Sequence, residues 1–156
     1  MILTAYFFRF PMEKKENRIL NRVAKDVENI LIIILHPIDI TCQNCSISFF
    51  TLCDSLTRRG LNDRVIGIFE MFPGTGKKTV KDQTKIFKKQ LRGFVTANKI
   101  RFPVLADDKQ IFQHSSEKGS RLILMNTVYG IVQEWLFPVE EHQISEIMIL
   151  LNSRRG

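Results

Sequence analysis

The sequence predicts an α/β domain of three layers, with a mixed central sheet between two layers of helices. From residue 29 onward, short apolar segments of strand length alternate with longer segments of helical periodicity, which is typical of parallel strands joined by crossover helices. The last two apolar segments are separated only by a turn at residues 127–130, which indicates an antiparallel hairpin. Parallel and antiparallel strands are therefore expected in one sheet.

The central strand is expected at residues 29–35, because this run carries no charge and is apolar on both faces, as interior strands of α/β sheets are. The next expected element is a helix at 42–59, ended by Gly60. The later elements are expected in this order: a strand at 64–71, a basic helix at 79–98, an extended segment at 102–105, strands at 122–126 and 131–137, and a helix at 140–151.

All 156 residues are expected to form one domain, with the core at 29–151. Residues 1–28 are expected to be an N-terminal extension, with a strand at 2–10 and a helix at 14–28. No apolar run approaches the roughly 20 residues that a membrane span needs. The first ten residues lack the basic start and the small-residue cleavage site of a signal peptide, so they are not interpreted as an intact one, and the sequence leaves the compartment open: cytoplasmic if no export signal has been removed. An export signal that had been removed would instead place the protein in the periplasm or cell envelope.

The most informative motif is the C-x-x-C pair Cys42 and Cys45, which follows the central strand and opens the next helix. A helix N-terminus presents unpaired N–H groups and the positive end of the helix dipole, so it favours the thiolate form of a cysteine. A second sulfur three residues later can close a disulfide within one helical turn. This arrangement indicates thiol–disulfide chemistry, with a structural or relict cysteine pair as the alternative.

Other ligand classes are less well supported by the sequence. A structural zinc ion needs four ligands, and there is only one cysteine pair, with three scattered histidines, so no metal or other cofactor is expected. The net charge of +7 comes mainly from the helix at 79–98, whose basic residues form one solvated face. No nucleic-acid motif accompanies that face, so nucleic acid is not an expected partner. Cys53 lies on a buried helical stripe and is expected to be an inert core thiol.

Taken in order, the strand into the C-x-x-C pair, the strand at 64–71, the segment Phe102-Pro103-Val104-Leu105-Ala106-Asp107 and the terminal hairpin resemble the thioredoxin superfamily. The similarity is strongest to TlpA-like thiol–disulfide oxidoreductases and to the related AhpC/TSA proteins. The resemblance implies that Cys42 is the exposed attacking sulfur and Cys45 the resolving one.

The chain departs from this family at three supporting positions. The cis-proline that relatives carry before the strand at 122–126 is replaced by Ser120-Arg121, and the aromatic residue before the first cysteine is Thr41. The acidic residue that thioredoxins bury beneath the cysteines has no counterpart at residues 32–34, which are all isoleucine. The loop at Ser120 is nevertheless expected to face the cysteines across a shallow groove. Arg121 is expected to stabilise the Cys42 thiolate if it turns inward.

A second resemblance, to peroxiredoxins, rests on Pro37 and Thr41, which lie where those enzymes place a shielding proline and a peroxide-binding threonine. Cys45 would then be the peroxidatic thiol and Arg121 its helper, although both are one residue out of the usual spacing. The leading expectation is a thiol–disulfide oxidoreductase whose partners are protein thiols or disulfides. The alternatives are a thiol peroxidase and a non-catalytic binding module of the same fold.

Overall fold

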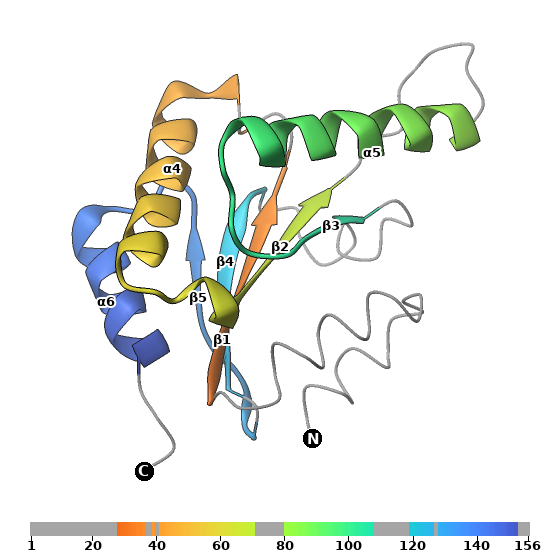
Figure 1. The fold of residues 1–156 in the computed structure, drawn as a ribbon. Helices are drawn as coiled ribbons and strands as arrows, with labels where there is room; N and C mark the ends of the chain where they lie inside the picture. Colours follow the sequence, from red (N-terminus) through yellow and green to blue (C-terminus); the bar gives the residue numbers. More distant parts are fainter. Residues whose placement is uncertain are drawn as a thin grey trace.

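The computed structural model describes residues 28–36, 39, 41–70, 80–107, 119–126 and 128–152. The strand and helix expected in residues 1–28 lie, but for residue 28, outside the described residues, and so does Pro37. Five strands form one sheet in the order β3-β2-β1-β4-β5 (Figure 1). Their bounds are β1 (Asn29–Leu35), β2 (Val65–Glu70), β3 (Val104–Asp107), β4 (Arg121–Asn126) and β5 (Gly130–Leu136).

The sheet is mixed, as the sequence predicts. β1 runs parallel to β2, and β2 runs parallel to β3. On its other side β1 pairs antiparallel with β4, which forms the expected hairpin with β5. β1 is therefore an interior strand, and both of its faces are covered: every residue from Ile30 to Leu35 is at most 2% exposed.

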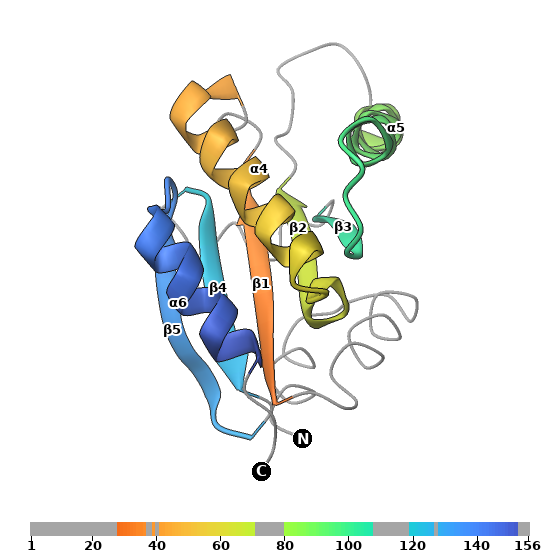
Figure 2. The ribbon, with the colours of Figure 1, turned by 60° about the vertical axis from the view of Figure 1, so that its left-hand side comes forward.

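Three helices contact the same face of this sheet: α4 (Gln43–Arg58), α5 (Val80–Ala97) and α6 (Glu141–Asn152). α4 and α6 lie side by side over the sheet, and α5 crosses near the first half of α4 (Figures 1 and 2). A short 3-10 turn, η1 (Asn62–Arg64), leads from α4 to β2. The helix expected at 14–28 lies, but for residue 28, outside the described residues, and so the second helical layer stays a prediction.

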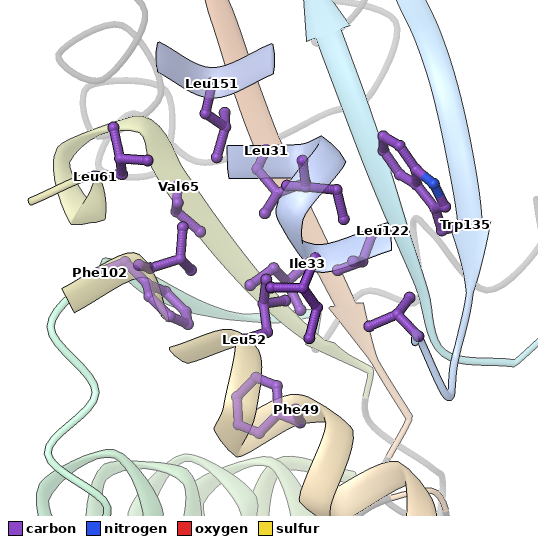
Figure 3. Packing of buried hydrophobic residues seen from close by; sticks show 14 of the residues in the cluster. Leu31, Ile33, Phe49, Leu52, Leu61, Val65, Phe102, Leu122, Trp135 and Leu151 are labelled. Carbon is purple, nitrogen blue, oxygen red and sulfur yellow. The ribbon is translucent and has the colours of Figure 1, made fainter. Parts of the chain in front are cut away.

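The hydrophobic core lies between these helices and the sheet (Figure 3). Alternate residues of β1, Leu31 and Ile33, meet Leu52 of α4 and Leu151 of α6. Phe49, Phe69 and Phe94 join α4, β2 and α5 through aromatic contacts, with ring centroids 5.4–6.3 Å apart. No described helix is long and apolar enough to cross a membrane.

The observed boundaries differ from the expected ones where backbone pairing is decided by distant residues. β1 has the predicted bounds, whereas β3 begins two residues later than the expected extended segment. Phe102 is instead a buried side chain before the strand, and the Pro103 carbonyl accepts a hydrogen bond from the Gly67 N–H at 2.8 Å. α4 begins at Gln43, because Cys42 has the extended backbone of an N-cap residue, with φ −77° and ψ 123°.

Candidate active site

The cysteine pair stands beyond the carboxyl end of β1, on the first turn of α4. Both thiols are free; Cys42 is exposed and Cys45 is partly buried. The two side chains are close enough for a hydrogen bond between them. This order of exposure is the one that the sequence predicts for an attacking and a resolving sulfur.

The environment of Cys42 favours its thiolate. Interaction with the backbone N–H of Cys45 lowers the Cys42 pKa most, followed by the Cys45 thiol and the backbone N–H of Asn44. The Cys42 thiol makes no capping hydrogen bond to the helix N-terminus. The interactions with these N–H groups therefore stabilise the thiolate rather than the thiol, which is why they lower the pKa. Desolvation and the charge of Asp39 oppose them. No acidic residue occupies the first turn of α4, which leaves the helix N-terminus available to the sulfur.

The other two thiols are held in the protonated form. Burial raises the pKa of Cys45 to about 11, and the hydrogen bond to Cys42, the charge of Cys42 and the charge of Asp39 act in the same direction. Burial also raises the pKa of Cys53 to about 12, and its side chain packs against the hydrophobic core. Cys53 is thus a partly buried thiol at the edge of the core, and its expected inertness stays a prediction. Of the three cysteines, Cys42 is the one whose pKa is lowered, which makes it the most readily ionised of the three thiols.

The Ser120 loop lies against the segment that precedes the cysteines, and the groove expected between this loop and the cysteines stays a prediction. The Ser120 hydroxyl accepts a hydrogen bond from the His36 N–H at 2.8 Å, and the Ser120 N–H donates to the Asp39 carboxylate at 2.9 Å. The Ser120 carbonyl accepts a hydrogen bond from the Phe137 N–H at 3.2 Å. In the described part of the chain the cis peptide bond is Phe137–Pro138, and the bonds on both sides of Ser120 are trans, as predicted.

The Arg121 side chain is buried, but it is not among the groups that stabilise the Cys42 thiolate. Its side chain is 3% exposed, and its Nε lies 3.4 Å from a carboxylate oxygen of Glu134. Arg121 pairs with Ile34 in the neighbouring strand β1, and paired residues point to the same face of a sheet. Their neighbours Ile33 and Leu122 belong to the core beneath α4, so the Arg121 side chain lies on the opposite face of the sheet. The groups that shift the Cys42 pKa do not include it. The expected stabilisation of the Cys42 thiolate by Arg121 is therefore corrected: its charge acts on carboxylates.

A buried carboxylate lies at the end of β2, where none was expected from the sequence, on the face of the sheet opposite to α4. Glu70, the last residue of β2, is 2% exposed and pairs in register with Asp107. Its Oε2 lies 3.8 Å from Nε2 of His36, whereas Oε1 has no hydrogen-bond partner within the described residues. Burial raises the Glu70 pKa, Arg121 opposes this, and Asp107 and Asp39 add to it. The sequence does contain a signal for this position: Glu70 is a charged residue at the end of the otherwise apolar strand β2.

The remaining predicted site features are more peripheral. Thr41 is exposed and directly precedes Cys42. A groove of about 290 Å³ runs along α4 from Asn44 past the exposed Ile47 to Pro138 and Val139 of the segment between β5 and α6. Ser48 lines this groove, and its hydroxyl both donates to the Val139 carbonyl and accepts from the Val139 N–H. The described side chains contain no cluster of three groups able to hold a metal ion.

The sequence matches no protein-family model and no curated protein. Solved structures are similar in fold. A thiol-disulfide isomerase from Corynebacterium glutamicum gives a TM-score of 0.61 at 16% identity, over 92% of this chain and 90% of that one. The N-terminal domain of PilB from Neisseria gonorrhoeae gives 0.57 at 15% identity, over 84% and 82%. A secreted Mycobacterium tuberculosis disulfide oxidoreductase homologous to E. coli DsbE gives 0.54 at 14% identity, over 80% and 82%. With its mixed sheet and the helix that follows β1, the chain is a thioredoxin-fold protein.

Proposed function

We propose that the protein exchanges disulfides with protein substrates through Cys42 and Cys45. The observation that carries this proposal is the opposite shift of the two thiols: the exposed sulfur has a lowered pKa, and its partly buried neighbour has a pKa raised to about 11. An attacking thiol must be accessible and ionised, whereas a resolving thiol must stay protonated until a mixed disulfide has formed.

In the reductive direction the Cys42 thiolate attacks one sulfur of a substrate disulfide. The substrate S–S bond breaks, one substrate sulfur leaves as a thiolate that takes up a proton, and a mixed disulfide with Cys42 remains. Cys45 then loses its proton and attacks the Cys42 sulfur, which releases the second substrate thiol and leaves a Cys42–Cys45 disulfide. Two electrons pass from the pair to the substrate, and the reverse sequence oxidises a substrate dithiol.

A protein substrate suits the surroundings of the pair. The groove beside Asn44 and Ile47 is shallow and open, and the Ile47 side chain is 57% exposed. Such a surface fits an extended polypeptide better than a small molecule that needs enclosure. Its position next to the first turn of α4 would hold a substrate chain within reach of Cys42.

The peroxidase alternative assigns the reactive thiol to Cys45. A peroxidatic cysteine must be ionised at working pH, and the raised pKa of Cys45 argues against this role. Arg121 would have to stabilise that thiolate, but its guanidinium lies against Glu134 on the other face of the sheet. The geometry therefore favours Cys42 as the attacking sulfur.

Single serine variants test the assignment. Cys45→Ser should trap a mixed disulfide between Cys42 and a protein substrate, visible on a non-reducing gel, and Cys42→Ser should abolish insulin disulfide reduction. Cys53→Ser is the matched control and should behave as wild type. Sulfenic acid at Cys45 in Cys42→Ser, with peroxide consumption by wild type, would establish the peroxidase instead. A folded wild type that is inactive in both assays would establish a binding module.

The direction of exchange is decided by the reduction potential of the pair. Equilibration with glutathione buffers and quantification of the two free thiols gives this value. A potential near −270 mV would identify a reductant, and one near −120 mV an oxidant.

A further inference from the structure

Asp39 connects three segments that meet at the cysteine pair. Its N–H donates a hydrogen bond to the His36 carbonyl at 3.0 Å, and its carbonyl accepts one from the Cys42 N–H at 3.2 Å. Its carboxylate accepts the Ser120 N–H at 2.9 Å. Together with the bond from the His36 N–H to the Ser120 hydroxyl at 2.8 Å, these contacts tie the end of β1, the start of α4 and the loop before β4 into one unit.

The Ser120 loop is shaped to receive this carboxylate. Gly119 has a φ of +73°, a conformation that residues with a Cβ rarely adopt. A Cβ at Gly119 would lie at van der Waals distance, 3.4 Å, from Oδ2 of Asp39, so this loop and the carboxylate are in direct proximity. A proline at Ser120 would have no N–H to donate. Ser120 therefore supplies a donor that this carboxylate uses directly.

The negative charge of Asp39 affects the pKa of titratable groups on three neighbouring parts of the fold, β1, β2 and the start of α4. It raises the pKa of Cys42 and Cys45 on α4, of His36 at the end of β1, and of Glu70 on β2. Burial lowers the pKa of His36 and so favours its neutral form, and the charge of Arg121 on β4 acts on Glu70. The carboxylate thus opposes the helix N-terminus in its effect on the thiol of Cys42.

We propose that Asp39 is a positioning residue of the cysteine pair: its carboxylate anchors the Ser120 loop to the turn that leads into Cys42, and it places a negative charge close to the exposed thiol. The link to catalysis rests on the proposed disulfide exchange. The two roles separate chemically, because a hydrogen-bond acceptor can be kept while the charge is removed.

Two substitutions make this separation. Asp39→Asn keeps an acceptor oxygen for the Ser120 N–H and loses the charge, whereas Asp39→Ala loses both. Asp63→Asn is the matched control, because Asp63 is exposed in η1, before the amino end of β2 and away from the cysteines.

The charge is tested by the rate of iodoacetamide alkylation of Cys42 against pH. Asp39→Asn and Asp39→Ala should both move the profile to lower pH and raise the rate at pH 6 about twofold to fivefold. The gain is limited because a less basic thiolate is also a weaker nucleophile. Asp63→Asn should leave the profile unchanged. A wild-type profile in Asp39→Asn would overturn the charge role.

The anchor is tested by hydrogen exchange at the Ser120 amide, followed by NMR. Exchange should be about tenfold faster in Asp39→Ala than in wild type, and Asp39→Asn should lie within about threefold of wild type. Equal exchange in Asp39→Ala and wild type would overturn the anchor role. If Asp39→Ala does not fold, Asp39→Ser serves in its place, since its short hydroxyl does not reach the Ser120 N–H.

Neither measurement needs catalytic turnover. If wild type fails the insulin assay, the proposed function falls, while the alkylation and exchange results still decide the role of Asp39. If wild type is active, Asp39→Ala should raise the KM for a disulfide peptide at least about threefold, with Asp39→Asn close to wild type. An unchanged KM in Asp39→Ala would separate the anchor from substrate positioning and overturn its catalytic consequence.

Discussion

Alkylation of the reduced protein at pH 7 should label Cys42 at least about tenfold faster than Cys45. A pKa of about 11 leaves about one Cys45 in ten thousand ionised at pH 7, against about one in a hundred for a thiol with the reference pKa of 9.0. A more basic thiolate is also a stronger nucleophile, and this raises the alkylation rate of Cys45 by roughly tenfold, which offsets part of the hundredfold loss of thiolate. Cys45 is therefore roughly tenfold slower than an ordinary thiol, and Cys42, whose pKa is lowered, is faster than one.

The assay uses iodoacetamide at a short reaction time, followed by proteolysis and fragment mass spectrometry. Fragmentation is needed because Cys42 and Cys45 are too close to separate by digestion. The wild-type chain is the right sample, since Cys42→Ser would remove two of the causes that raise the Cys45 pKa. Cys53, with a pKa of about 12, should be the slowest thiol. Labelling of Cys45 as fast as Cys42 would refute the assignment of attacking and resolving sulfurs.

Three further changes test the packing and charge around the site. Ser48→Ala should cost about 2–4 kcal/mol in urea unfolding, because it leaves the buried N–H and carbonyl of Val139 without their hydrogen-bond partner. Gly67→Ala should cost about 1–3 kcal/mol, since its Cβ would lie 2.9 Å from Cε2 of Phe102. Glu70→Gln should remove a pH dependence of stability. The raised folded pKa of Glu70 stabilises the protein at low pH, and this is lost as pH rises from about 4.5 through the folded pKa, as urea titrations across pH would record.

The first two of these changes have matched controls. Thr51→Ala also removes a hydroxyl from α4, but that hydroxyl only donates to the Ile47 carbonyl within the helix, so the cost should be small. Gly93→Ala adds a methyl group in α5 with no atom within 4 Å and should stabilise the protein by about 0.5–1 kcal/mol. A constant difference between Glu70→Gln and wild type at all pH values would contradict the titration of this carboxylate.

The arrangement of strands and helices could be predicted because it follows from local patterns. β1 has the predicted bounds, since an uncharged apolar run has few alternatives to a central strand. The reactive end of α4 was also predictable, because a C-x-x-C pair after a strand places its first sulfur at the helix N-terminus. β3 was displaced because its pairing with β2 begins at Gly67, a partner that is distant in sequence.

The surroundings of the thiols could not be predicted in the same way. Glu70 reaches the neighbourhood of His36 only because β1 and β2 pair in a particular register, and sequence spacing does not give that register. Arg121 illustrates the same difficulty, since a shift of one residue along β4 would place its side chain on the opposite face. The hydrogen bond between the Ser120 N–H and the Asp39 carboxylate joins residues that are far apart in sequence, so it could not be predicted from local patterns.

The bonds that join Ser120 to His36 and Asp39 span 84 and 81 residues of chain. α4 can begin to form from local sequence alone, but these bonds require β4 to have docked beside β1. A chain that has been synthesised only as far as α5 therefore carries the cysteine pair without the loop opposite it. In such a chain the groups that shift the Cys42 pKa, Asn44, Cys45 and Asp39, are already present, whereas the Ser120 N–H that the Asp39 carboxylate accepts is added only with the last strands of the sheet.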